Sequence, residues 1–115
     1  MTSESSSWQK NFTMQIGRLA ASAEVQQAYL RKLGVDADEL ALEFDSLYVP
    51  DRLSLSETQT SYARRIDKIF QELSTGPDSG QWSYDGLQSD PRWAEVRAVA
   101  SQFFTSLEPE KRGAL

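Results

Sequence analysis

The sequence predicts an all-α protein, a compact bundle of four to five antiparallel amphipathic helices. In several segments apolar residues recur every three or four positions, which is the spacing of one helix face. No segment alternates apolar and polar residues over more than a few positions, and no Asn-Gly or Asp-Gly pair joins two β-branched runs. The connections between the periodic segments are mostly short, which favours helices that lie antiparallel to their neighbours.

The chain is long enough for one domain. Its 115 residues, of which 39% are hydrophobic, support a single core without disulfides or a structural metal. Residues 1–7 are small and polar and are expected to be a disordered tail. Residues 8–107 are predicted to form the helical domain, and residues 108–115 a frayed C-terminal tail.

The first predicted helix begins at Trp8. Its apolar stripe consists of Trp8, Phe12, Ile16 and Leu19. A second helical stretch, residues 24–33, has an apolar face formed by Val25, Tyr29 and Leu33. Gly34 follows this stretch, and glycine is the commonest residue just beyond a helix C-terminus. Ser22 either separates the two stretches into two helices or lies within one.

A capping pattern marks the next helix. Asp36 with Glu39 matches the capping box, in which a side chain accepts a hydrogen bond from the backbone N–H three residues later. The apolar face of this helix is formed by Leu40, Phe44, Leu47 and Tyr48. The helix should end near Val49, because Pro50 disfavours helical conformation in the residue before it.

The longest periodic segment follows a second capping pattern, Ser54 with Glu57. Its apolar face is formed by Tyr62, Ile66, Ile69, Phe70 and Leu73. It should end at Gly76-Pro77, inside a loop of residues 74–81 whose Gly, Pro and Ser content disfavours regular structure.

Two helical pieces are predicted at the C-terminal end. Residues 83–88 favour a short turn of helix. Asp90-Pro91 is typical of an N-cap followed by a proline in the first helical position. The apolar stripe of this last helix consists of Trp93, Val96, Ala100, Phe103 and Leu107.

The composition excludes most catalytic constellations. The chain has no Cys and no His, so it lacks disulfides, thiol nucleophiles, zinc-thiolate sites and the commonest general base. We expect no catalytic residue, no metal site and no cofactor. Glu39 and Glu43, one helical turn apart, leave a carboxylate-only metal-dependent enzyme as an alternative.

The charge balance bears on partners and location. A net charge of −5 disfavours binding to nucleic acid or to anionic membranes and favours a basic protein partner. The N-terminal segment is polar and no apolar run reaches 18 residues, so we expect a cytoplasmic protein. The cationic residues Arg64, Arg65 and Lys68 are too few for nucleic-acid recognition and are expected to pair with acids of a neighbouring helix.

The strongest functional signal is a block of charged residues between Lys32 and Arg52. All its members are acidic: Asp36, Asp38, Glu39, Glu43, Asp45 and Asp51. They lie away from the apolar stripe of the predicted helix, on the side that also carries Leu42. This side is either a docking surface for a basic partner or a solvated face whose first acids complement the helix N-terminus. The predicted docking residues are Asp38, Glu39, Leu42, Glu43, Asp45 and Tyr48, with Leu42 and Tyr48 as apolar anchors.

A second acidic run lies between Lys68 and Arg92 and is interleaved with Trp82 and Tyr84. Its acids are Glu72, Asp78, Asp85 and Asp90. We expect Trp82 to cover helix ends, since Trp is usually partly buried. Tyr84 is either part of the same lid or a contact residue.

Two family resemblances bear on this interpretation. Residues 29–34 (YLRKLG), 38–45 (DELALEFD) and 93–97 (WAEVR), together with Trp82 after a Gly-containing loop, resemble small acidic helical proteins of actinomycetes, a group of uncharacterised function. Residues 45–50 (DSLYVP) are similar to the Asp…Tyr-Tyr-Pro segment of nuclease-bacteriocin immunity proteins, with Val49 in place of the second tyrosine. In that family the acidic helix and the tyrosines contact a basic toxin.

The sequence therefore predicts a non-enzymatic, immunity-protein-like module that neutralises or escorts a basic protein partner. In this mechanism the carboxylates pair with Lys or Arg side chains that the partner uses on its own substrate. A secretion chaperone or adaptor is an alternative, and it would dimerise and present a large apolar groove. The metal-dependent enzyme is a further alternative.

Overall fold

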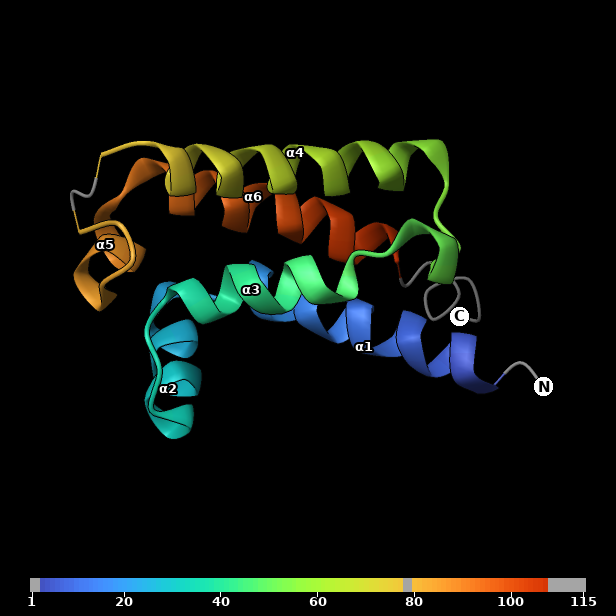
Figure 1. Cartoon of the computed structure of the whole chain (residues 1–115), viewed down its shortest axis with the longest axis horizontal. Coiled ribbons are helices and arrows are strands. Elements are labelled where there is room, and N and C mark those ends of the chain that lie inside the picture. Colours follow the sequence, from blue (N-terminus) through green and yellow to red (C-terminus); the bar gives the residue numbers. More distant parts are fainter. Residues whose placement is uncertain (1–2, 78–79, 108–115) are drawn as a thin grey trace.

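The described part of the chain, residues 3–77 and 80–107 of a computed structural model, is built from six α-helices and one short 3₁₀ helix, with no β-strand (Figure 1). The elements are α1 (Ser3–Ala20), α2 (Ala23–Leu33), α3 (Asp38–Leu47), η1 (Pro50–Arg52), α4 (Glu57–Thr75), α5 (Tyr84–Ser89) and α6 (Pro91–Ser106). The all-α prediction is confirmed, with more helices than the expected four to five. None of the helices in these residues is long and apolar enough to cross a bilayer.

The first helix begins earlier than the sequence pattern predicted. α1 starts at Ser3 rather than at Trp8, so residues 3–7 of the expected tail are helical. Each residue that extends an existing helix gains a backbone hydrogen bond without a new nucleation cost, so polar residues continue it readily. Trp8 fixes this end, because its indole Nε1 donates to the Leu47 carbonyl at 2.8 Å. Residues 1–2 and 108–115 of the expected tails lie outside the described part.

Ser22 separates α1 from α2. Its Oγ accepts a hydrogen bond from the Val25 N–H at 3.2 Å, as expected for an N-cap. Gly34 ends α2 in the left-handed conformation, with φ of 74°, and its N–H donates to the Leu30 and Arg31 carbonyls. Ser22 and Gly34 therefore set the two ends of α2, as their residue types predict.

The predicted apolar face of α2 is not the buried one. Val25 and Leu33 are 58% and 50% exposed, and Tyr29 is only partly buried. The buried positions are Ala23, Gln26 and Leu30. The apolar pattern predicted the wrong face because the central buried residue, Gln26, is polar. Its amide can be buried because it forms hydrogen bonds inside the protein.

Neither predicted capping box forms. The N-cap of α3 is Ala37, which makes no side-chain cap bond. Backbone carbonyls take the first N–H groups instead: Ala37 donates to Trp82 O and Glu39 to Asp36 O, both at 3.1 Å. Asp36 therefore contributes its backbone carbonyl to the start of this helix, and not the predicted side-chain cap.

The capping box of α4 lies two residues after the predicted one. Ser56 Oγ accepts from the Gln59 N–H at 3.1 Å, and Gln59 Oε1 accepts from the Ser56 N–H at 2.9 Å. The N–H of Ser54 donates to Gln9 Oε1 at 2.9 Å, which ties the segment before α4 to α1. Ser54 is thus part of a tertiary contact rather than a cap.

Most members of the remaining stripes are buried as predicted, whereas Trp8, Leu47, Tyr48, Tyr62 and Leu107 are only partly buried. Phe12, Ile16 and Leu19 of α1 are fully buried, as are Leu40 and Phe44 of α3. Of the predicted stripes of α4 and α6, the buried members are Ile66, Ile69, Phe70, Leu73, Trp93, Val96, Ala100 and Phe103. The core is aromatic at its centre, where the rings of Phe12 and Phe103 lie 5.8 Å apart and those of Phe70 and Trp93 5.5 Å apart.

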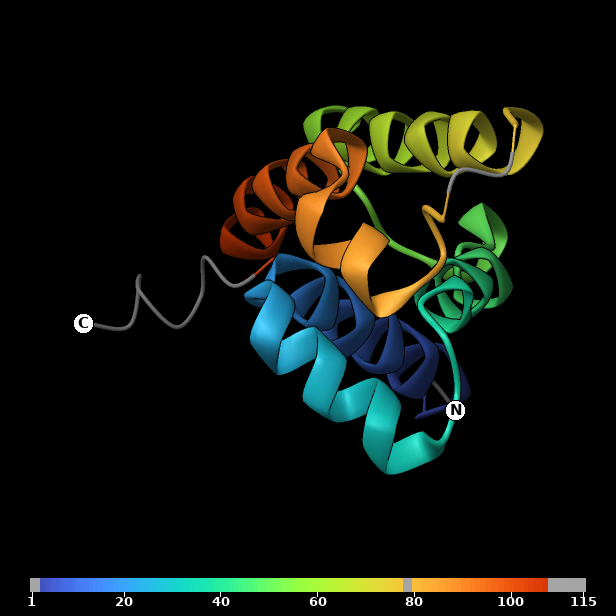
Figure 2. The ribbon, with the colours of Figure 1, turned by 90° about the vertical axis from the view of Figure 1, so that its left-hand side faces the viewer.

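Four of the helices, α1, α3, α4 and α6, form an arch with one open edge. α6 packs against both α1 and α4, and α3 packs against α1, so the order of neighbours is α3, α1, α6, α4. Neighbours in this order run in opposite directions (Figure 1). Figure 2 shows the ribbons of α3 and α4 separated along the edge where a closed bundle would bring them together. Beneath this edge Phe44 and Phe70 meet edge to face, with ring centroids 5.7 Å apart.

Three buried glutamines connect the helices. Gln26 Nε2 donates to the carbonyls of Arg18 and Leu19 at the end of α1, both at 3.0 Å, and its Oε1 accepts from Arg97 Nη1 at 3.1 Å. Carbonyls in the last turn of a helix lack partners within the helix, so this amide completes the end of α1. Burial lowers the pKa of Arg97.

The other two glutamines make equivalent contacts. Gln15 Nε2 donates to Leu40 O of α3 at 3.0 Å. Gln81 Nε2 donates to Leu73 O near the end of α4 at 2.8 Å, and the Gln81 carbonyl accepts from the Trp93 indole at 2.8 Å. Each glutamine therefore joins different elements of the fold.

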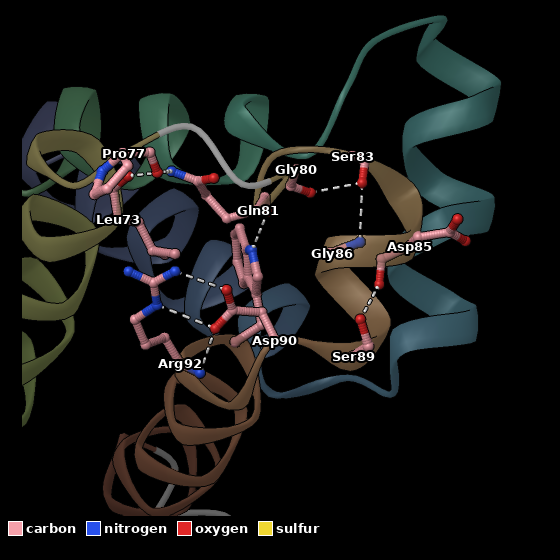
Figure 3. Close-up of polar contacts among 11 residues, drawn as sticks. Leu73, Pro77, Gly80, Gln81, Ser83, Asp85, Gly86, Ser89, Asp90 and Arg92 are labelled. Atoms are coloured by element: carbon pink, nitrogen blue, oxygen red, sulfur yellow. Dashed lines mark hydrogen bonds and ion pairs between the residues drawn. The ribbon is translucent and has the colours of Figure 1, made fainter.

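The connection between α4 and α6 is a compact polar network (Figure 3). Ser83 Oγ donates to the Gly80 carbonyl at 2.6 Å and accepts from the Gly86 N–H at 3.0 Å, which caps α5. Gly86 lies directly against this backbone, because a Cβ added there would approach Gln81 Cα to 2.8 Å. Only glycine fits between α5 and the segment before it.

Asp90 begins α6 as predicted. Its Oδ1 accepts from the Arg92 N–H at 2.8 Å, and Pro91 occupies the first helical position. The Arg92 guanidinium also donates to both Asp90 oxygens, at 3.1 and 2.8 Å (Figure 3). This hydrogen-bonded cation holds the pKa of Asp90 below its usual range.

Candidate functional site

The six predicted docking residues lie on α3 and at its end, but on different sides of it. Asp38, Leu42 and Asp45 are exposed. They are spaced four and three residues apart, which places them on one face. Leu42, with 59% of its surface exposed, lies between the two carboxylates.

Glu39 and Glu43 belong to the opposite flank of α3. Glu43 Oε1 accepts a hydrogen bond from the Tyr29 hydroxyl of α2 at 3.1 Å. Burial and this hydrogen bond raise the pKa of Tyr29. The Arg18 guanidinium lies 4.8 Å from the centroid of the Tyr29 ring, so Glu43 is part of a contact between α1, α2 and α3.

Tyr48 packs against the core. Its ring stacks on Phe44 at 5.4 Å and lies 6.1 Å from Phe12. The side chain is partly buried. Tyr48 thus shares the buried side of α3 and not the face that carries Leu42.

A groove follows the open edge between α3 and α4. It consists of two adjoining hollows of about 350 and 240 Å³ that share Ala41, Leu42 and Ser74. We call it the α3–α4 groove; it is lined by Asp36, Asp38, Ala41, Leu42, Phe44, Asp45, Asp67, Phe70, Gln71, Ser74, Thr75 and Trp82. The exposed face of α3 therefore forms one wall of a concave surface.

Carboxylates stand at both ends of the α3–α4 groove. Asp36 and Asp38 belong to the hollow that reaches Trp82, and Asp45 and Asp67 to the hollow that reaches Phe70. Among the described lining residues there is no Lys or Arg. Asp67 accepts a hydrogen bond from Gln71 Nε2 at 2.9 Å, which orients its carboxylate on α4.

Trp82 serves as both lid and groove wall. Its ring meets Trp93 edge to face, with centroids 6.0 Å apart, and its carbonyl accepts from the Ala37 N–H. The expected covering role is thus confirmed. Trp82 also lines the groove, beside the start of α3 and the end of α4.

Tyr84 is held by two contacts from the α2 end of the molecule. Its hydroxyl donates to Val35 O at 2.8 Å, and Arg31 lies 4.9 Å from the centroid of its ring. Of the second acidic run, Asp90 caps α6, Glu72 and Asp85 are exposed, and Asp78 lies outside the described residues.

Three contributors to the groove were missed by the sequence interpretation: Asp67, Phe70, which lines the groove although it is largely buried, and Trp82 as a wall. Asp67 lies 22 positions after Asp45, and no local pattern links the two. Of the basic cluster, Arg65 pairs with Glu95 of α6 as expected, at 4.0 Å between exposed groups. Within the described part of the chain no three acidic side chains converge as a metal site would require.

Comparison with protein-family models, with curated proteins and with solved structures finds no match to this chain. The two resemblances named above therefore remain predictions.

Proposed function

We propose that this chain is a non-enzymatic, acidic protein-binding module that neutralises or escorts a basic protein partner, such as a toxin domain. The observation that carries the proposal is the α3–α4 groove, where four carboxylates lie on either side of the exposed Leu42. Exposed apolar surface supplies affinity, and surrounding charge supplies orientation and a faster encounter. The net charge of −5 adds to the attraction for a basic protein.

The proposed mechanism is occlusion. The carboxylates of Asp38 and Asp45 pair with Lys or Arg side chains that the partner needs for its own substrate. Leu42 contributes the apolar contact between them. Glu39, Glu43 and the Tyr48 hydroxyl lie on other sides of α3, so their contribution is electrostatic steering rather than contact within the groove.

Affinity capture with charge-reversal variants tests this proposal. The tagged protein is incubated with a lysate of its source at low and at high salt, and retained proteins are identified by mass spectrometry. We expect the wild type to retain a basic protein that high salt releases. The double variant Asp38→Lys, Asp45→Lys should lose it. The control Glu39→Lys, Glu43→Lys has the same change of net charge on the opposite flank and should lose less.

Two results would contradict the proposal. One is that no basic protein is retained specifically by the wild type. The other is that Asp38→Lys, Asp45→Lys retains the same protein as well as the wild type does, with a helical circular dichroism spectrum that shows the fold is intact.

A dimeric adaptor is a second candidate, and one observation favours it. Val25 and Leu33 leave an apolar face of α2 exposed. Two copies that buried this face would form a dimer. Light scattering after size exclusion distinguishes the candidates, because the adaptor requires a dimer and Val25→Asn, Leu33→Asn would convert it to a monomer.

A further inference from the structure

The shape of the α3–α4 groove favours a particular kind of ligand. Four helices that close a bundle each touch two neighbours, but α3 and α4 lie at the two ends of the arch and leave one edge open. Phe44 and Phe70 are buried beneath this edge and line its inner side, and the exposed Leu42 protrudes from its wall. Helical proteins commonly bind an amphipathic helix in such a groove, where it packs as another helix of the bundle would.

The spacing of the charges along the groove is that of a helix. Asp38 and Asp45 are seven residues apart, which at 1.5 Å per residue is about 10.5 Å, or two turns. Leu42 lies between them. A ligand helix with two basic residues seven positions apart, and a large apolar residue between them on the same face, would match this arrangement.

A second carboxylate lies at each end of the groove. At the Asp45 end Asp67 faces the groove from α4, and at the Asp38 end Asp36 lies beside Trp82. Each end therefore presents two carboxylates, while Ala41, common to both hollows, lies in the middle. Complementary charge places cations at the two ends of the ligand and none in its centre.

Other occupants fit less well. An extended peptide that adds a strand needs a sheet edge, and the described residues contain no strand. A second copy of this chain would bring another net charge of −5 toward four carboxylates.

We propose that the α3–α4 groove receives a basic amphipathic helix of the partner, with Lys or Arg seven residues apart and a large apolar residue between them. This inference rests on the proposed function and adds the structure of the partner's binding element. α3 has ten residues, so about three turns of the ligand helix contact it.

Two synthetic helices of identical composition test the proposal. The in-register probe is an 18-residue alanine-based peptide with two Lys seven positions apart and Leu between them on the same face. In the out-of-register probe one Lys is moved by two positions, onto the other side of the helix. Fluorescence anisotropy of the labelled peptides is measured at physiological salt, and we expect the in-register probe to bind the wild type about tenfold more tightly.

Matched leucines serve as controls on the protein. Leu42→Asn should weaken binding of the in-register probe about tenfold, whereas Leu33→Asn, which replaces a leucine on α2 that is also about half exposed, should leave the affinity unchanged. Equal affinity for the two probes, or an unchanged affinity in Leu42→Asn, would overturn the proposal. A wild-type dimer that Leu42→Asn dissociates would also overturn it, because the groove would then be occupied by a second copy.

The outcome separates this inference from the proposed function. In one outcome the wild type captures a basic partner, the double variant Asp38→Lys, Asp45→Lys loses that partner, and the two probes bind with equal affinity. The module then binds a basic protein, but through an element other than the proposed helix. If the wild type captures no basic partner and the probes bind alike, both proposals fail.

Discussion

At the scale of single residues, Gly86 is the position where substitution has the clearest expected effect. A Cβ at this position would contact the backbone of Gly80 and Gln81, which has no flexible end to move aside. Gly86→Ala should therefore lower the free energy of unfolding by roughly 1–3 kcal/mol, the usual cost of overpacking. Urea denaturation followed by circular dichroism measures it.

Gly76→Ala is the matched control for this prediction. Gly76 has an ordinary extended backbone, and its nearest contact to an added Cβ is 3.4 Å from Glu72 O. The free energy of unfolding of Gly76→Ala should differ from that of the wild type by less than about 0.5 kcal/mol. A similar effect of both substitutions would mean that the close approach at Gly86 is relaxed in solution.

Asp90 gives a prediction about pH. Its folded pKa is lowered by the hydrogen bonds from Arg92, so the ionised form stabilises the native state. This contribution is complete above the unfolded pKa of about 4 and is lost as the pH falls through the lower folded value. Asp90→Asn keeps a good N-cap but removes the charge. The urea midpoint of the variant should lie below that of the wild type at pH 7, and the two should converge in strong acid.

At the scale of elements, the start of α4 distinguishes two serines that the sequence pattern does not. Ser56→Ala removes the cap and should destabilise the protein by about 1 kcal/mol. Ser54→Ala leaves the backbone bond to Gln9 in place and should change the unfolding free energy by less than about 0.5 kcal/mol. A larger loss of stability in Ser54→Ala than in Ser56→Ala would place the N-cap of α4 at Ser54, as the sequence pattern predicted.

The elements also show what a single sequence predicts well. Strong apolar periodicity located the core faces of α1, α3, α4 and α6, because burying large side chains dominates folding. Gly34 and Asp90-Pro91 located helix ends, because their backbone requirements are local. The face of α2 was wrong, because its buried Gln26 counts as polar in any hydropathy pattern.

Gln26 therefore gives an element-scale prediction of its own. Gln26→Leu keeps the volume but leaves the last carbonyls of α1 and the Arg97 guanidinium without this partner. Buried groups that lose a hydrogen bond cost about 1–3 kcal/mol, so the variant should unfold at lower urea. Gln102→Leu, on the exposed side of α6, is the control and should have a much smaller effect.

At the scale of the whole molecule, the acidic wall of the candidate site was predicted and the groove was not. Asp38, Leu42 and Asp45 are neighbours on one helix, so spacing alone relates them. Asp67 and Trp82 join them only because α3 and α4 come to opposite sides of one opening, through contacts such as that of Ala37 with Trp82. No short-range pattern encodes such an arrangement.

The three buried glutamines have a consequence for how the molecule responds to ionic strength. Their amides are neutral, so salt does not screen the hydrogen bonds that they donate to backbone carbonyls of other elements. The proposed attraction between groove carboxylates and a basic ligand, by contrast, is screened within about 8–10 Å at physiological salt. Raising the salt should therefore weaken binding and leave the melting temperature nearly constant. A ligand could then be exchanged repeatedly by ionic strength alone, with the same folded molecule available for each new cycle.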